Sequence, residues 1–224
     1  MRRLIVNADD LGYDPEIDRG ILEAHQGGLV TSATAMVDTP FAAAALAAAP
    51  PTLGVGLHLV LDPALDRAAA AAEVARQLDR FAALRGAPPT HLDSHKHAHA
   101  RPAVLEAVMD AAAARGLPVR AVDAPMRAAL RGRGIATSDR FLGDAERRPC
   151  WTEAALAAAL AGLGEGLTEL MAHPGHAPRV ARTSFGAERE VELRALVSPA
   201  CRAALAAAGG VLCTWADAAA VARR

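Results

Sequence analysis

The sequence predicts an α/β protein of the TIM-barrel-like (β/α) type with about seven strands. Short apolar runs of strand type alternate with runs of helix type along the chain of 224 residues. Side chains that can bind metal ions lie at the ends of four strand-type runs, at Asp10, His58, His95 and His173. Because the carboxyl ends of parallel strands share one face of a barrel, we expect a metal site at that face.

The predicted strands are short apolar runs that end in polar or turn residues. Leu4, Ile5 and Val6 form such a run, which ends in Asn7. The strand expected at residues 91–94 follows two prolines, and the strand expected at 169–172 ends in a His-Pro-Gly turn. The complete set covers residues 4–8, 31–37, 54–61, 91–94, 119–122, 169–172 and 210–214.

The predicted helices fill the intervals between these strands, and several are rich in alanine. Gly116 and Gly209 stand where the C-terminal caps of two helices are expected. Residues 131–144 form the longest predicted loop. The helices are expected at residues 16–26, 41–48, 69–84, 102–115, 126–130, 151–163 and 187–208, the last with a break near Pro199.

Composition and charge indicate one domain over residues 1–224, long enough to bury a substantial core. The chain has 24 Lys and Arg against 25 Asp and Glu, which gives no electrostatic case for a nucleic-acid or anionic-membrane partner. Three cysteines without paired spacing argue against a disulfide framework and favour the cytoplasm. The apolar run near the start is too short for export, and no alanine-rich run could span a bilayer. A homodimer is a candidate assembly.

Four of the eight histidines lie within residues 91–99, together with Asp93. The segment reads as a short strand that runs into a loop, so alternate side chains would share a face. His95, His97 and His99 are then expected to project together. A single histidine usually has a structural role, but four histidines with a carboxylate indicate a metal site.

Asp9 and Asp10 follow the first predicted strand directly. Two adjacent carboxylates there could simply begin a turn or a helix. They could also divide the work of a metal-assisted hydrolase, one binding a cation and the other taking a proton from water.

His58 and His173 stand at the ends of other apolar runs. A strand histidine such as His58 is more often a buried core residue than a ligand, but the neighbouring glycines allow close approach of a ligand. His173 precedes Pro174 and Gly175, so it marks either a simple turn or a functional strand end.

Taken in order, these motifs are similar to those of one enzyme family. They are Asn-Ala-Asp-Asp-x-Gly at residues 7–12, Gly-x-Gly-x-His-Leu at 54–59, His-x-Asp-Ser-His-x-His-x-His at 91–99 and His-Pro-Gly at 173–175, with further similarity at 28–34 and 139–143. The chain resembles the YdjC-like carbohydrate deacetylases. The resemblance implies a TIM-barrel-like fold and hydrolysis of acetyl groups from N-acetylated sugars in oligosaccharides or glycolipids. It also implies that Asp10, His58 and His95 bind the metal and that Asp9 is the general base.

The expected chemistry follows from these roles. A divalent ion with open coordination positions would lower the pKa of water from about 16 toward about 7 and stabilise the oxyanion. Asp9 would accept the water proton, and His173 would protonate the departing amine. Two imidazoles and a carboxylate suit zinc or a similar ion, whereas the resemblance implies magnesium. Substrate contacts or support of the metal ligands are expected from Asn7, His97, His99 and Arg140.

Two departures from the family pattern bear on the substrate. Lys96 stands where the family usually has histidine, and the segment from Asp62 to Arg85 is short. The sequence therefore leaves the identity of the acetylated sugar open. Two other functions also stay open, because barrels of this kind serve several hydrolases: a metal-dependent phosphoesterase or other amidase, and a non-enzymatic metal-binding or scaffold protein.

Overall fold

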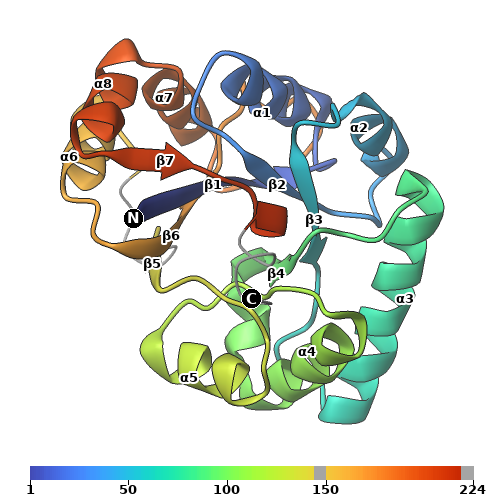
Figure 1. Cartoon of the computed structure of the whole chain (residues 1–224). Helices are drawn as coiled ribbons and strands as arrows, with labels where there is room; N and C mark the ends of the chain where they lie inside the picture. The colour runs from blue at the N-terminus through green and yellow to red at the C-terminus, as the bar shows by residue number, and fades with distance from the viewer. Residues whose placement is uncertain (144–149, 218–224) are drawn as a thin grey trace.

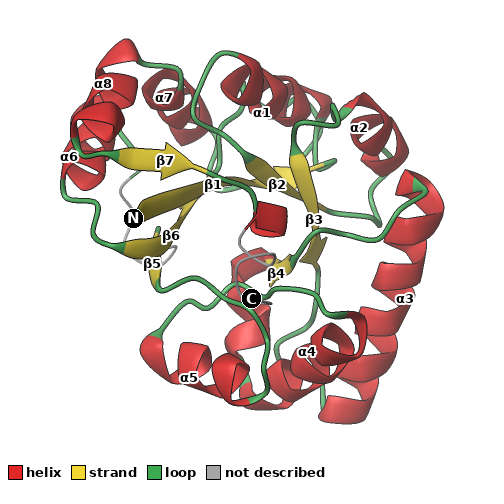
Figure 2. Cartoon of the chain, in the orientation of Figure 1, coloured by secondary structure: helices red, strands yellow, loops and turns green. Residues whose placement is uncertain are grey.

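A sheet of parallel strands forms the centre of the molecule, and helices surround it (Figures 1 and 2). The computed structural model describes residues 1–143 and 150–217. The strands are β1 (Arg2–Leu11), β2 (Ser32–Ala35), β3 (Gly54–Leu59), β4 (Leu92–Ser94), β5 (Arg140–Leu142), β6 (Gly166–Ala172) and β7 (Gly210–Leu212). The helices are α1 (Pro15–Gln26), α2 (Ala42–Ala48), α3 (Arg67–Arg85), the 3₁₀ helix η1 (His95–Ala100), α4 (Pro102–Arg115), α5 (Ala124–Gly132), α6 (Glu153–Ala161), α7 (Ala187–Leu196) and α8 (Pro199–Ala207).

The sheet is a partly open barrel with β1 at its centre. Its order is β4-β3-β2-β1-β6-β5, and β7 also pairs with β1. One edge of β1 pairs with β6, while the other pairs with β7 near its start and with β2 near its end. Within the described ranges no strand ladder joins β4 to β5. This seven-stranded parallel arrangement agrees with the predicted α/β class, although the sheet does not close completely.

The core lies between the strands and the surrounding helices. Every residue of β1 from Leu4 onward is buried. Helix α1 shows how the sequence covers this strand: Asp14 caps its first turn by accepting the Glu16 N–H at 2.9 Å. Three buried apolar residues then follow at helical spacing, namely Ile17, Ile21 and Ala24.

The predicted strand at residues 119–122 is wrong. Only Val119 makes a bridge, to Leu92 of β4, and helix α5 begins soon afterwards at Ala124. Val119 donates to the carbonyl of Ala136 at 3.0 Å, so this short segment lies between β4 and the chain that leads into β5. The four residues that were predicted to form a strand therefore make a single bridge, and Asp123 then caps the N-terminus of α5.

The predicted loop at residues 131–144 is confirmed over residues 133–139 and wrong on either side of them. It contains the end of α5 and the whole of β5, and residues 144–149 lie outside the described part of the chain. Strand β5 has three residues, too few for a periodic pattern, and it is a strand because it pairs with Thr168 to Leu170 of β6. By contrast, the predicted break near Pro199 is confirmed, since it separates α7 from α8.

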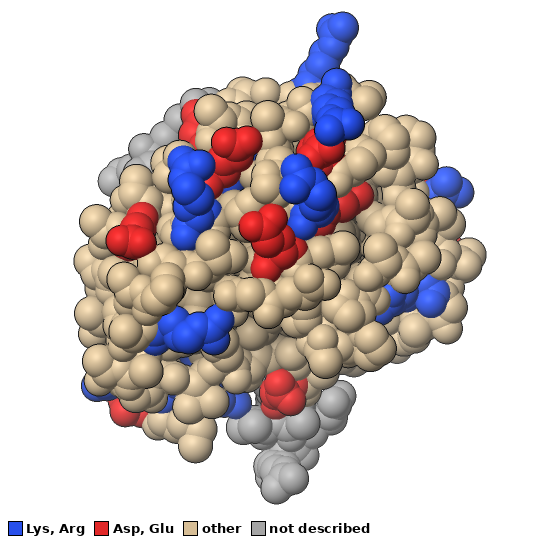
Figure 3. Space-filling model, turned by 90° about the horizontal axis from the view of Figure 1, so that it is seen from above, with Lys and Arg blue, Asp and Glu red and all other residues tan. Residues whose placement is uncertain are grey.

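The distribution of surface charge agrees with the nearly equal numbers of basic and acidic residues. On the face shown in Figure 3, basic and acidic side chains are interleaved and no large area of one sign forms. Exposed ion pairs elsewhere in the described chain include Arg67–Asp110 and Arg76–Asp38. Across the described ranges, every helix is too short or too polar to cross a membrane.

Candidate metal centre and active site

The ends of β1, β3 and β4 bring three predicted metal ligands together. Asp10 Oδ1 lies 3.4 Å from His58 Nε2 and 3.4 Å from His95 Nδ1. These three atoms all lie within 4.8 Å of one another. Asp10 and His58 are buried, whereas the His95 side chain is 31% exposed. The cluster is therefore set into the protein and reaches solvent on the His95 side.

The backbone of β1 is irregular where its two aspartates stand. In a regular strand adjacent side chains point to opposite faces. Here the pairing with β2 changes register between Ala8 and Leu11, and Asp10 adopts the left-handed region with φ 74°. Such conformations are uncommon for residues other than glycine and often occur at functional sites. Asp9 and Asp10 consequently both act on the pKa of the same imidazole, that of His58.

The donor atoms of this cluster fit a divalent cation. Asp10 Oδ1 is buried and has no hydrogen-bond partner among the residues that the structure describes. Asp10 Oδ2 accepts a hydrogen bond of 2.6 Å from Arg189. Ligand atoms about 2.1 Å from a tetrahedral zinc ion stand roughly 3.4 Å apart, which is the spacing found here. Burial alone would raise the pKa of Asp10, but His58, His95 and Arg189 together hold it well below its usual value.

Asp93 orients the His58 ring. His58 Nδ1–H donates to Asp93 Oδ1 at 2.7 Å, so the other ring nitrogen, Nε2, faces Asp10. Burial would lower the pKa of His58, but Asp93, Asp10 and Asp9 outweigh it and raise this pKa to about 10. A cation at this position would therefore replace a proton on His58.

A second set of potential ligands is already occupied by an arginine. Ligand atoms of Asp9, His58 and Asp93 also lie within 4.8 Å of one another. However, Arg120 Nη1 is 2.7 Å from Asp9 Oδ2 and 2.8 Å from Asp93 Oδ2. The guanidinium supplies the positive charge that a cation would bring, so the set with Asp10 and His95 is the better candidate.

Asp9 accepts hydrogen bonds from Arg120, Asn7 and Thr34. Arg120 Nη1 and Nη2 each donate to one of its oxygens at 2.7 Å, and Asn7 Nδ2 donates to Oδ1 at 2.8 Å. Burial would raise the pKa of Asp9, but the charge and hydrogen bonds of Arg120 hold it far below its usual value. Asp9 is thus a firmly positioned carboxylate beside the candidate metal ligands.

Arg120 belongs to this cluster, although the sequence did not predict it as a site residue. It is buried, it contacts three carboxylates, and its guanidinium lies 5.5 Å from the centre of the Phe141 ring. One signal was available, because a charged residue inside a predicted buried strand needs a partner. Arg189 lies in a helix of ordinary charged composition and gave no such signal.

His173 is brought to the same site. Its backbone N–H donates to the buried Glu192 carboxylate, and its ring lies 5.2 Å from that of Phe185. The imidazole acts on the pKa of Asp9, which places the two predicted catalytic groups within electrostatic reach of each other.

His95, His97 and His99 do not line one face of a strand as predicted, although the rings of His97 and His99 lie 6.1 Å apart. The chain turns at His95 into η1, in which Lys96 and His97 adopt left-handed conformations with φ 52°. His99 is buried, with its ring nitrogens bonded to Ser94 Oγ and to the Arg120 carbonyl, so it supports the arginine. The two nitrogens of His97 are buried and unpartnered in the described part of the chain.

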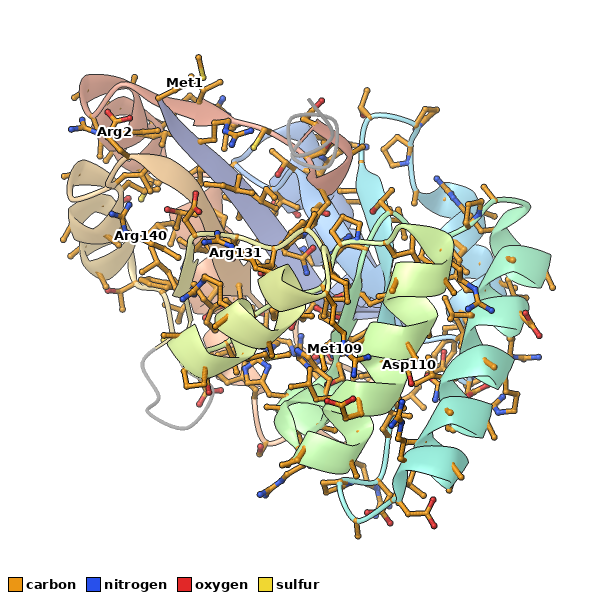
Figure 4. All side chains as sticks on the ribbon, turned by 60° about the horizontal axis from the view of Figure 1, so that its bottom comes forward. Met1, Arg2, Met109, Asp110, Arg131 and Arg140 are labelled. Carbon is orange, nitrogen blue, oxygen red and sulfur yellow. The ribbon has the colours of Figure 1, made fainter. Side chains whose placement is uncertain are left out.

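The structure does not bring Arg140 to this cluster. Arg140 is at the start of β5, and its guanidinium donates to the carbonyl of Glu165 at 2.6 Å, just before β6 begins. Figure 4 shows it in the same part of the molecule as Arg131 of α5. Asp9 and Asp10 stand near the opposite end of β1.

Comparison with known proteins identifies the same family as the sequence motifs. The family profile described as YdjC-like protein matches residues 3–64 and 62–207. A carbohydrate deacetylase of Geobacillus stearothermophilus is 36% identical over 244 aligned positions, covering 96% of this chain and 97% of the relative. A chitooligosaccharide deacetylase of Enterobacter sp. (strain 638) is 36% identical over 250 positions, covering 96% and 98%.

Two solved structures are similar to this chain in fold. A protein of Enterococcus faecalis V583 described in connection with cellobiose-phosphate cleavage has a TM-score of 0.82 at 25% identity, covering 96% of this chain and 98% of its own. A family 4 acetyl xylan esterase from Clostridium thermocellum, solved with a cobalt ion, has a TM-score of 0.60 at 13% identity, covering 98% and 91%. The esterase resembles this chain in fold. Family profile, near full-length relatives and fold together show that the chain belongs to the YdjC-like family.

Proposed function

We propose that this protein is a metal-dependent carbohydrate deacetylase that hydrolyses the acetamide of an N-acetylated sugar. The two relatives at 36% identity are named as deacetylases of carbohydrates, and they align over nearly their whole length. The observation that carries the proposal is Asp10 Oδ1, a buried oxygen without a hydrogen bond, 3.4 Å from two imidazole nitrogens. The carboxylate of the adjacent residue, Asp9, is available for proton transfer.

Asp10, His58 and His95 would hold the divalent ion. When bound, the ion supplies a Lewis acid that acidifies water and polarises the acetyl carbonyl. Asp93 keeps His58 in the tautomer that a metal ligand needs, and Arg189 keeps Asp10 turned toward the two rings. Two imidazoles and one carboxylate favour zinc, cobalt, nickel or ferrous iron over magnesium, which prefers oxygen ligands.

Asp9 and His173 would move the protons. Asp9 accepts a proton from the attacking water, and its ion pair with Arg120 fixes where that proton is received. His173 delivers a proton to the sugar nitrogen, because amide cleavage requires the nitrogen to leave as a neutral amine. The half-buried position of His173 allows it to meet a substrate that enters from solvent.

His97 and Asn7 have different supporting roles in this proposal. The unpartnered nitrogens of His97 can donate to and accept from a bound sugar, which is the arrangement that a polar ligand would satisfy. Asn7 donates to Asp9 and also accepts from His91 at 3.0 Å, so it links the proposed base to the buried His91 ring.

Substrate profiling tests the proposal against the other hydrolase functions. The purified protein, loaded separately with zinc, cobalt and magnesium, is assayed for acetate release from N-acetylglucosamine, its di- and trisaccharides and an N-acetylglucosaminyl lipid. The same preparations are assayed for phosphate release from sugar phosphates. We expect acetate release with at least one metal and its loss on chelation. Phosphate release without acetate release would instead identify a phosphoesterase.

A further inference from the structure

Glu169 is a buried carboxylate with no role in the mechanism above. It lies in the middle of β6 and is fully buried. Its Oε1 accepts a hydrogen bond of 2.7 Å from Arg120 Nε, and its Oε2 has no partner among the described residues. A buried carboxylate is costly unless its charge is matched, so its position beside the arginine that holds Asp9 needs an explanation.

The Arg120 guanidinium, with one positive charge, contacts three carboxylates. Its Nη atoms face Asp9 and Asp93, and its Nε faces Glu169. Each hydrogen bond from a guanidinium weakens a carboxylate as a base, because it favours the ionised form. The negative charge of Glu169 also acts on Asp9, where it opposes part of the electrostatic effect of Arg120.

The structure assigns Glu169 as a positioning residue that acts through Arg120: its carboxylate fixes the guanidinium that binds Asp9 and offsets part of its charge. The inference rests on the proposed function, in which Asp9 is the general base. The other groups around Glu169 agree with this role, since its partners on the adjacent strands are apolar, Ile5 in β1 and Phe141 in β5. The charged groups that act on it are Arg120, Asp93 and Asp9.

The substitution Glu169→Gln removes the charge and keeps the size and an oxygen that can still accept from Arg120. Burial, opposed by Arg120, raises the pKa of Glu169 to about 7. The wild-type carboxyl is therefore mostly protonated at pH 5.5 and mostly ionised at pH 8.5. We expect the kcat of the wild type to exceed that of the variant by about tenfold at pH 8.5 and to be nearly equal to it at pH 5.5, with KM unchanged.

The matched control is Glu165→Gln, just before the same strand, where the side chain is 70% exposed. Its kcat should equal that of the wild type at both pH values. A ratio for Glu169→Gln that is the same at pH 5.5 and 8.5 would overturn the inference, because a purely structural defect does not follow the ionisation of one carboxyl. A kcat of Glu169→Gln that equals that of the wild type at both pH values would overturn it as well.

A second measurement separates this inference from the proposed function. Because the pKa of Glu169 is raised on folding, the folded wild type binds more protons than the unfolded chain between about pH 4.5 and pH 7. The melting temperature of the wild type should fall relative to that of Glu169→Gln as pH rises through this window. A wild type that releases no acetate from any acetylated sugar contradicts the proposed function. A melting-temperature difference independent of pH contradicts the charge sharing assigned to Glu169.

Discussion

Arg189 and Asp10 are 179 positions apart in the sequence and form a buried ion pair of 2.6 Å at the candidate metal centre. The guanidinium binds Asp10 Oδ2 and leaves Oδ1 toward His58 and His95. Arg189 is itself held, because its Nε donates to the carbonyl of Phe185 at 2.9 Å. The ion pair thus determines which oxygen of Asp10 is available to a metal ion.

Replacing this arginine should weaken metal binding. In Arg189→Met, Asp10 loses the partner that orients it, and we expect zinc affinity to fall by about 10 to 100-fold, the usual effect of losing a group that supports a metal ligand. Competition with a chromophoric chelator measures the affinity. The control is Arg194→Met on the same helix, where the side chain is 68% exposed. Equal zinc affinities for Arg189→Met and the wild type would show that the ion pair does not orient the ligand.

His95→Ala should remove most of the bound metal, because two protein ligands make an incomplete site. Elemental analysis after dialysis against zinc gives the metal content per chain. His97→Ala is a matched loss of an imidazole two positions away, and it should keep its metal because neither His97 nitrogen joins the cluster with Asp10. Full metal content in His95→Ala would exclude His95 as a ligand.

Asp9→Asn should separate chemistry from metal binding. The amide keeps an oxygen for Arg120 but cannot accept a proton, so kcat should fall by about 100 to 10,000-fold. Metal content should stay close to that of the wild type, since Asp9 lies outside the favoured ligand set. Asp10→Asn should instead lower the metal content, because Asp10 belongs to the favoured ligand set. Wild-type kcat in Asp9→Asn would rule out its role as base.

Asp18 should make stability depend on pH. It is buried in α1 and accepts the Gly12 N–H at 2.5 Å, and its burial raises the pKa to about 7. The folded state therefore binds more protons than the unfolded state between about pH 4 and pH 7, so the free energy of unfolding falls as pH rises across this window.

Asp18→Asn keeps the acceptor for Gly12 and removes this dependence. Relative to the wild type, the variant should gain stability of the order of a few kcal/mol at pH 8 and almost none at pH 4, as measured by urea unfolding. Asp79→Asn, at an exposed position of α3, is the control. A stability difference that does not change with pH would contradict the raised pKa.

Substrate length should have little effect on turnover. The segment after His58 is short and is largely the helix α3, and the relatives align over 244 and 250 positions against 224 residues here, so they contain segments that this chain lacks. We infer that the missing segments would have been substrate-binding wall, so that distant sugar units should add little binding energy in the transition state. We expect similar kcat/KM for mono-, di- and tri-N-acetylglucosamine. A steep rise with length would reveal an extended cleft.

The place of the candidate ligands at strand ends could be predicted from the sequence because that signal is local, whereas their choice as the ligand set was implied by the family resemblance. Asp10, His58 and His95 each stand at or just beyond the end of an apolar run, and parallel strands bring such ends to one face. The break before Pro199 was predictable for the same reason, since proline interrupts a helix wherever it stands. Strand β5 was not, because three residues carry no period and the strand exists only through its pairing with β6.

The sequence by itself determined the α/β class, the order of most elements and the residue types at the strand ends, because side-chain period and turn chemistry are properties of neighbouring residues. Only the tertiary structure decided which groups hold the side chains of the site in place. Arg120 reaches Asp9 across 111 positions, and the two nitrogens of His99 are bonded to Ser94 and Arg120 rather than facing a metal. Such ion pairs and ring orientations depend on distances between segments far apart in the chain, and no local pattern records those distances.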